Sequence, residues 1–205
     1  MALNLDKIDL KKEIADLKKI AGEQRGNDAK FLVDYIKKKE GENGFARLKK
    51  ELEKNGYALP DVDKIKNTEW IPASIPTIIM VSAAKFFRWE EEDVFEMGRK
   101  VLSFSPSIKL FFKYFLSPRK TFSLAEKAWK KIYSFSEIKL IKYDEKNKII
   151  VMRVYNFKKH PITCVYLRGG ISKFAEIATG LKKVKAEETK CMFKGDPYHE
   201  YTFKF

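Results

Sequence analysis

The residues best suited to chemistry gather at the end of the chain, in the stretch ETKCMFKGDPYHEYTFKF. It holds Cys191 and His199, one of the two cysteines and one of the two histidines, on either side of a Gly-Asp-Pro turn. Thiolate and imidazole are ligands that zinc favours, and the same pair can act as a nucleophile with its base. The stretch is therefore a metal site, a thiol site or an apolar hairpin.

Strand alternation indicates which way these two side chains point. In the last strand His199 and Tyr201 share one face, which we expect to be the core face. Pairing Phe193 with His199 and Cys191 with Tyr201 would make Cys191 and His199 diagonal neighbours, about 7–8 Å apart at their Cα atoms. Their sulfur and imidazole could then meet around one ion.

A structural zinc site needs four ligands, and the hairpin supplies two. Only Cys164, His160 or a carboxylate remain to complete the set. The sequence alone therefore favours a packed apolar hairpin over metal binding by Cys191 and His199, and metal binding over thiol chemistry.

Other catalytic patterns are absent from the sequence. There is no Gly-rich phosphate loop, no Ser/His/Asp spacing and no pair of carboxylates at a catalytic spacing. Cys164 and Cys191 are too few for a disulfide framework, and we expect both to be reduced. The sequence therefore predicts a protein that is not an enzyme and that carries no cofactor.

The charge of the chain is uneven. The net charge is +14, and residues 101–205 carry 22 Lys and Arg against 9 Asp and Glu. This excess indicates either an anionic partner such as nucleic acid or a Lys-rich proteome. A single glutamine, Gln24, beside so many charged residues is typical of a thermophile, which favours the second explanation.

No apolar run is long enough to span a membrane, and the N-terminal residues mix acids and bases where a signal peptide would be apolar. We therefore expect a cytoplasmic protein without a membrane span.

The elements that must position these residues follow from periodicity. Apolar spacing predicts an N-terminal helical segment over residues 1–58, and an irregular connection separates it from a second domain over 70–205. Ser-Pro starts and apolar stripes predict further helices in the second domain. Their expected ranges are 75–87, 90–102, 106–116 and 118–134.

The period changes to that of strands after residue 137. Two strand-like runs, a helix over 162–179 and two last strands over 183–193 and 198–205 predict the order β-β-α-β-β. The fold class is therefore α+β, with an N-terminal helical bundle followed by an antiparallel sheet.

Large aromatic side chains are concentrated before and within this sheet. They are too many to bury independently, and the Gly169-Gly170 pair beside Arg168 leaves room for a ligand or for a close helix contact. The expected ligand-binding residues are Phe111, Phe112, Phe115, Trp129, Tyr133, Tyr155, Tyr166, Arg168 and Phe174.

The final hairpin also resembles a known pattern. Cys191, Gly195 and His199 stand at the spacing of the Cys-x3-Gly-x3-Cys ending of vinyl-reductase-type ligand-binding domains, with histidine in the second cysteine position. VYLRGGISKFAEIATG and the element order carry the rest of the resemblance, over about residues 70–205. It implies the superfamily shared with haem nitric-oxide-binding domains and the Golgi transport (TRAPP) subunits, whose fold has several helices followed by an antiparallel sheet with an inserted helix.

Haem ligation does not follow from this resemblance. The haem-binding branch holds the propionates with Tyr-x-Ser-x-Arg, whereas the corresponding residues 155–159 read YNFKK, without serine or arginine. No histidine precedes His160, so the proximal ligand of that branch is also missing.

The sequence and the resemblance together predict a sensor or adaptor module that binds a small apolar or amphipathic ligand without haem, as a homodimer. The alternative is a nucleic-acid-binding protein that uses the basic second half.

Overall fold

The computed structural model describes residues 8–101, 118–182 and 184–204. The chain is α+β, as predicted, and forms two compact units, Met1–Asp93 and Val94–Phe205. The sequence had placed the division between 58 and 70. The expected helix 106–116, with Phe111, Phe112 and Phe115, lies outside the described residues.

Helices dominate the first unit. Helix α1 begins at Asp9, whose carboxylate accepts hydrogen bonds from the free N–H groups of Lys11 and Lys12. A short antiparallel pair of strands, β1 and β2, joins the helices, and its three-residue strands are too short to show alternation in the sequence. The elements of this unit are α1 (Leu10–Leu17), β1 (Glu23–Arg25), α2 (Asn27–Lys54), a 3-10 turn (Val62–Lys64), β2 (Trp70–Pro72) and α3 (Ser74–Phe86).

Helix α2 consists of two helical stretches joined by a kink, both within the predicted N-terminal helical segment. Its backbone leaves the helical region at Gly41, where φ is 78°, a value that glycine adopts without strain. Helix α3 lies at the centre of the unit, because Ile78, Ile79 and Val81 are fully buried.

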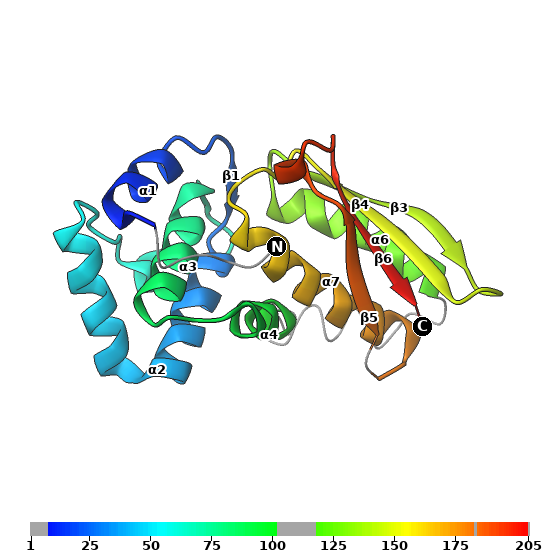
Figure 1. Cartoon of the computed structure of the whole chain (residues 1–205), viewed down its shortest axis with the longest axis horizontal. Coiled ribbons are helices and arrows are strands. Elements are labelled where there is room, and N and C mark those ends of the chain that lie inside the picture. The colour runs from blue at the N-terminus through cyan, green and yellow to red at the C-terminus, as the bar shows by residue number, and fades with distance from the viewer. Residues whose placement is uncertain (1–7, 102–117, 183, 205) are drawn as a thin grey trace. The chain divides into compact units, whose positions relative to one another are not determined.

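The second unit contains the predicted β-β-α-β-β order. Its sheet has the strand order β3-β4-β6-β5 with every neighbouring pair antiparallel, and α6 and α7 pack on one face of it (Figure 1). The elements are α4 (Glu91–Val101, which begins in the first unit), α6 (Pro118–Ile132), β3 (Glu137–Asp144), β4 (Ile149–Tyr155), α7 (Ile162–Thr179), β5 (Lys185–Lys190), a 3-10 turn (Met192–Lys194) and β6 (His199–Lys204).

The core of the second unit lies between the helices and the inner face of the sheet. Strand β4 alternates buried and half-buried residues, and the odd-numbered residues of β6 point inward, as the sequence predicted. The fully buried members of this core include Phe122, Ile150, Val154, Ala175, Tyr201 and Phe203.

Helices α4 and α7 cross with their backbones in contact. A Cβ atom on Gly98 would lie 2.0 Å from the Tyr166 carbonyl oxygen, and one on Gly169 would lie 2.0 Å from the Phe95 carbonyl oxygen. Arg99 donates to both carboxylate oxygens of Glu176, each at 3.0 Å, beside the crossing. The tandem glycines therefore serve a close helix contact.

None of the described helices is both long and apolar enough to cross a membrane.

Candidate metal centre

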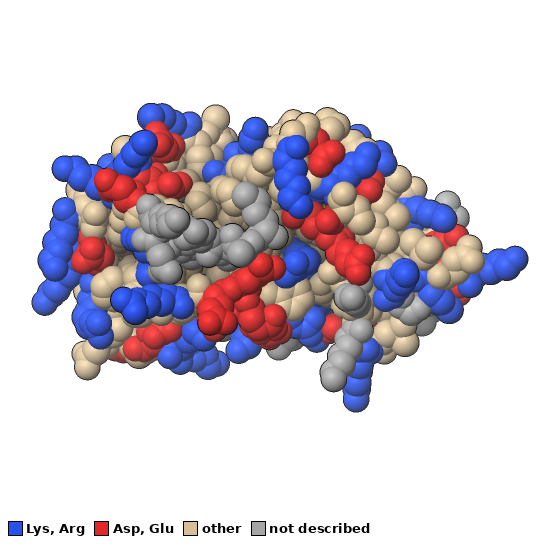
Figure 2. Space-filling view, viewed as in Figure 1, with Lys and Arg blue, Asp and Glu red and all other residues tan. Residues whose placement is uncertain are grey.

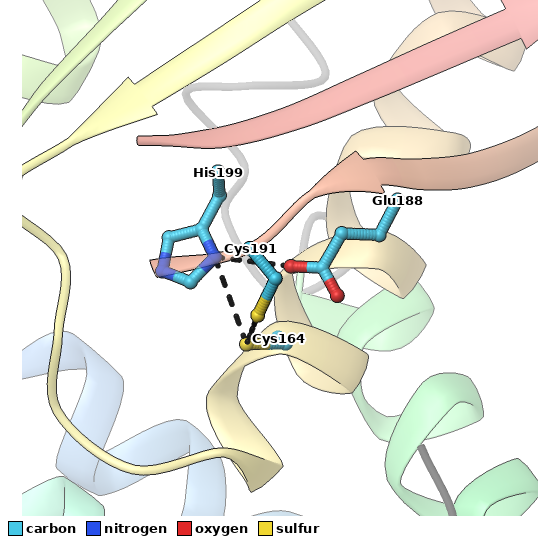
Figure 3. A group of neighbouring side chains, drawn as sticks. All are labelled: Cys164, Glu188, Cys191 and His199. Atoms are coloured by element: carbon cyan, nitrogen blue, oxygen red, sulfur yellow. Dashed lines mark hydrogen bonds and ion pairs between the residues drawn. The ribbon is translucent and has the colours of Figure 1, made fainter. Parts of the chain in front are cut away.

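Four side chains from distant parts of the second unit converge at one point (Figure 3). Cys164 comes from the first turn of α7, Glu188 from β5, Cys191 from the residue after β5, and His199 from the start of β6. One donor atom of each lies within 4.8 Å of those of all the others.

An irregularity in β5 aligns two of these residues. Glu188 pairs with Tyr201, but Lys190 pairs with Glu200, so Thr189 is an extra residue on this strand. Regular pairing would have placed Cys191 opposite residue 198, on the outer face. The bulge moves Cys191 alongside His199, and both side chains point inward with Glu188.

The turn that follows is wider than the predicted hairpin. The Cys191 N–H donates to Asp196 Oδ2 at 2.8 Å, and the Lys194 N–H donates to the Cys191 carbonyl at 2.8 Å. Gly195 has a φ of 97° and closes the turn. The predicted pairs Phe193–His199 and Cys191–Tyr201 are therefore wrong, because Phe193 lies in the 3-10 turn and Tyr201 pairs with Glu188.

Cys164 reaches the cluster because His160 helps to start α7. The Nδ1 atom of His160 accepts the Ile162 N–H at 3.1 Å, and its carbonyl accepts the Thr163 hydroxyl at 2.6 Å. Burial lowers the pKa of His160 to about 4, so the ring is neutral. His160, which the sequence allowed as a metal ligand, is a capping residue.

Three distances in the cluster are close to those around a single tetrahedral ion. The two sulfur atoms are 3.7 Å apart, Cys164 Sγ lies 3.7 Å from His199 Nδ1, and Nδ1 lies 3.0 Å from Glu188 Oε1. Zn–S bonds of about 2.3 Å place two tetrahedral sulfur ligands about 3.8 Å apart, and Zn–N and Zn–O bonds of about 2.0 Å place N and O about 3.3 Å apart. A disulfide would need about 2.05 Å between the sulfur atoms.

The contacts of His199 leave two acceptor atoms facing each other unless a proton or a metal ion lies between them. Its Nε2 lies 3.2 Å from the Phe157 carbonyl oxygen, which can only accept, so Nε2 carries a proton. In a neutral ring Nδ1 is then a bare acceptor, 3.0 Å from the carboxylate of Glu188, which is also an acceptor. Either a proton or a metal ion must lie between them.

The burial of these side chains also favours a positive charge at the centre of the cluster. Cys164, Cys191 and His199 are 6%, 4% and 0% exposed. Burial raises the pKa of the Cys164 thiol, and the nearby Glu188 carboxylate raises it further. Burial is the largest single influence on the pKa of Glu188 and would raise it, but hydrogen bonds to His199, Cys191 and Cys164 and the charge interaction with His199 together outweigh burial, and the pKa is lowered. A metal ion would displace the thiol protons and balance the buried negative charge.

The structure thus brings together the predicted pair Cys191 and His199 and adds Cys164, one of the residues considered to complete the set. Glu188 was missed. Only the bulge at Thr189 turns its side chain to the same side as Cys191, and no periodic pattern reveals such a bulge.

The expected ligand-binding residues that the structure describes lie in more than one place. Trp129 and Tyr133 belong to an aromatic cluster with Phe135 and Phe157, in which Trp129–Tyr133 and Tyr133–Phe157 ring centres are 4.5 and 5.3 Å apart. Trp129 also donates from its indole N–H to Ser136 at 3.2 Å.

Phe174 packs against the same core as Trp129 and Tyr133, and the other three described members lie elsewhere. Phe174 packs on Phe122 with ring centres 5.1 Å apart, and Arg168 lies over the Phe95 ring at 5.2 Å. Tyr166 is buried at the α4–α7 crossing, and Tyr155 lies on the outer face of the sheet. A shared ligand pocket therefore stays a prediction.

Haem held in the manner of the haem-binding branch does not fit these residues. Phe157 occupies the position of the motif serine and is 1% exposed within the aromatic cluster. His160 caps α7, and His199 is engaged with Phe157 and Glu188. The chain has no third histidine.

Comparison with known proteins identifies the fold. No protein-family model and no curated protein matches the chain. Solved structures do: an H-NOX protein from S. oneidensis in the Fe(II)NO state is 15% identical, with a TM-score of 0.65 over 88% of this chain and 98% of that one.

Two more H-NOX structures match over the same 88% of this chain. An oxygen-binding H-NOX domain related to soluble guanylate cyclases is 14% identical, with a TM-score of 0.60 over 94% of its length. The Fe(II) unliganded H-NOX protein from K. algicida is 8% identical, with a TM-score of 0.61 over 95% of its length. The haem NO-binding-like fold that the sequence predicted is confirmed.

Proposed function

We propose that this chain is a small-molecule-binding sensor or adaptor module on the H-NOX fold, stabilised by one zinc ion. Cys164, Glu188, Cys191 and His199 are its ligands. The observation that carries the metal proposal is the convergence of these four donors, three of them buried and Glu188 half-buried, within 4.8 Å of one another.

The donor set favours zinc. Two thiolates and an imidazole are soft or intermediate ligands, which suit zinc better than magnesium or calcium, and tetrahedral spacing argues against octahedral ions. Four protein ligands leave no open position, so the ion has a structural role. It ties the first turn of α7 to β5 and β6, and the Phe157 carbonyl holds the His199 ring in the orientation that metal binding needs.

The ligand-binding part of the proposal rests on the fold. Two of the H-NOX proteins that match are described in an Fe(II)NO ligation state and as an oxygen complex. For this chain we propose an apolar or amphipathic small molecule and no haem, because both histidines are engaged elsewhere. A cytoplasmic location is part of the same proposal.

Nucleic-acid binding is the less favoured function. On the face drawn in Figure 2, Lys and Arg are interspersed with Asp and Glu instead of forming a patch of one sign. Several cations of the second unit are also paired, as Arg153 is with Glu200 at 2.7 Å.

Metal analysis tests the zinc site. Purified protein should contain about one zinc per chain, and replacement by cobalt(II) should give the intense absorption of tetrahedral cobalt with thiolate ligands. Glu188→Gln should weaken metal binding about 10- to 100-fold, whereas Glu187→Gln, one residue away and pointing outward, should not. Metal-free protein that fails to bind cobalt would contradict the proposal.

Ligand binding needs a separate test. Native mass spectrometry after gentle purification should show a co-purified apolar molecule, and haem added to the protein should give no Soret band of a ligated haem. A ligand at a hundredfold excess over its Kd should add about 2.7 kcal/mol of stability. A stoichiometric haem complex would overturn the proposal.

A further inference from the structure

The outer face of the sheet in the second unit has the composition of an interface. Helices α6 and α7 pack on the inner face, yet three of the four outward positions of the inner strand β4 are apolar or aromatic. An antiparallel sheet with one solvated face normally carries polar residues there. Ile149, Val151 and Tyr155 are instead half-buried on the outer face, and Tyr198 adds a second ring 5.4 Å from Tyr155.

Charged residues surround this apolar strip in an ordered way. Pairing across the strands forms a continuous row, Lys142–Val151–Thr202–Glu187, with a cation on the edge strand β3 and an anion on the edge strand β5. In the neighbouring row Arg153 of β4 pairs with Glu200 of β6. The two edges of the face thus differ in sign within the first row.

We infer that this outer face binds a second copy of the chain through a two-fold axis parallel to the strands. Such an axis places β3 opposite β5 and β4 opposite β6 of the second copy. Lys142 then faces Glu187 of the other copy, Arg153 faces its Glu200, and Val151 packs on its Thr202. Every one of these contacts occurs twice, as an isologous interface requires.

The internal ion pairs do not prevent these contacts. Lys142 lies 3.0 Å from Asp144 in its own chain, but both are near the surface, where such a pair is worth little and can be shared with a partner. Lys139 would face Lys190 of the second copy, at the rim, where solvent screens the repulsion.

The surface suits a copy of the chain better than a nucleic acid. Lys139 lies 5.3 Å from the centre of the Tyr155 ring, and Arg153 lies 4.3 Å from that of Tyr198, so cations occupy positions that bases would need for stacking. Glu137 and Glu200 stand beside the same rings and would repel phosphates.

The size of the face sets the expected strength. Strands about 4.8 Å apart and about six residues long make a four-stranded face of about 19 by 20 Å. That area, about 380 Å² on each copy, is smaller than a standard specific interface, so we expect only a weak dimer, with a Kd of about 1–100 µM. This inference does not depend on zinc or on a ligand.

The interface is tested by exchanging the charges of Lys142 and Glu187 and measuring the dimer Kd by analytical ultracentrifugation over a series of protein concentrations. Lys142→Glu and Glu187→Lys should each weaken dimerisation at least about 10-fold, and the double variant should return to within about threefold of wild type. Lys146→Glu, the same change in the exposed turn between β3 and β4, should have no effect.

The zinc content and Tm of each variant show whether it is folded. Val151→Arg, at the centre of the face, is a further variant that should weaken dimerisation. A wild-type monomer at about 1 mM would overturn the inference. So would a dimer that none of these substitutions weakens, or RNA binding that is lost in Tyr155→Ala.

Discussion

Two clusters lie under the same sheet and meet at Phe157. One is the donor cluster, which consists of Cys164, Glu188, Cys191 and His199. The carbonyl of Phe157 accepts the His199 N–H of this cluster, while its ring packs in the aromatic cluster of Trp129, Tyr133 and Phe135. The aromatic cluster is complete by itself, because ring contacts and one indole hydrogen bond satisfy its members. The donor cluster is not, because two of its acceptor atoms face each other and need a proton or a metal ion between them. One region is therefore stabilised by its own ring packing and hydrogen bond, whereas the other, on our proposal, also needs a bound metal ion.

The largest expected effect comes from removing the metal. A chelator stronger than the site should leave bare acceptors close together, with a loss of about 4 kcal/mol or more and a fall in Tm of about 8–16 °C. Differential scanning calorimetry before and after chelation measures it, and added zinc should restore the Tm. Identical unfolding transitions with and without zinc would show that the donor cluster, like the aromatic cluster, is stable without a metal ion.

Phe157→Ala should separate the two clusters. Removal of a ring that is 1% exposed should cost about 3–5 kcal/mol in urea unfolding. Zinc content should remain about one per chain, because residue 157 accepts the His199 hydrogen bond with its backbone carbonyl, which the substitution keeps. Loss of zinc from folded Phe157→Ala protein would show that the clusters are coupled through the ring.

His160 lies between Phe157 and the helix that carries Cys164. Through this residue the stability of the fold should depend on pH. Its folded pKa of about 4 lies below its unfolded value of about 6.5. Above pH 6.5 the ring is neutral in both states and has no effect. As the pH falls, the unfolded chain takes up the proton first, so stability should decline by up to about 3 kcal/mol by pH 4.

The comparison with His160→Asn isolates this effect, because asparagine can still accept the Ile162 N–H but does not titrate in this range. The difference in unfolding free energy between the two proteins should change between pH 7 and 4. A constant difference would contradict the neutral, buried histidine.

The smallest effect should come from Ser136, whose hydroxyl accepts the Trp129 indole N–H and donates to the Tyr155 carbonyl at 2.8 Å. Ser136→Ala should cost about 1–2 kcal/mol, since it leaves the indole without this partner. Trp129→Phe combined with Ser136→Ala should cost less than the sum of the single changes. Full additivity would mean that the hydrogen bond contributes nothing to the aromatic cluster.

The sequence predicted the elements well and their contacts poorly. Alternation in β6 placed His199 and Tyr201 inward, and the helix over 162–179 was found with its ends. The two-residue error in the pairing of Cys191 arose because the bulge and the 3-10 turn change the register without changing the composition. Cys164 could be named from its residue type, but its place depends on how α7 packs.

The bulge at Thr189 also defines what a transplanted or redesigned version of this site must contain. Three of the four donors form the sequence motif Glu-x2-Cys-x7-His. With this spacing the three side chains lie on one face only if one residue between Glu188 and Cys191 is left unpaired. A designer who kept all the residues but regularised the strand, so that Thr189 paired with Glu200, would keep every donor in the sequence and turn Cys191 away from His199. The irregular residue, which has no donor atom in the cluster, is thus as much a part of the specification as the four that do.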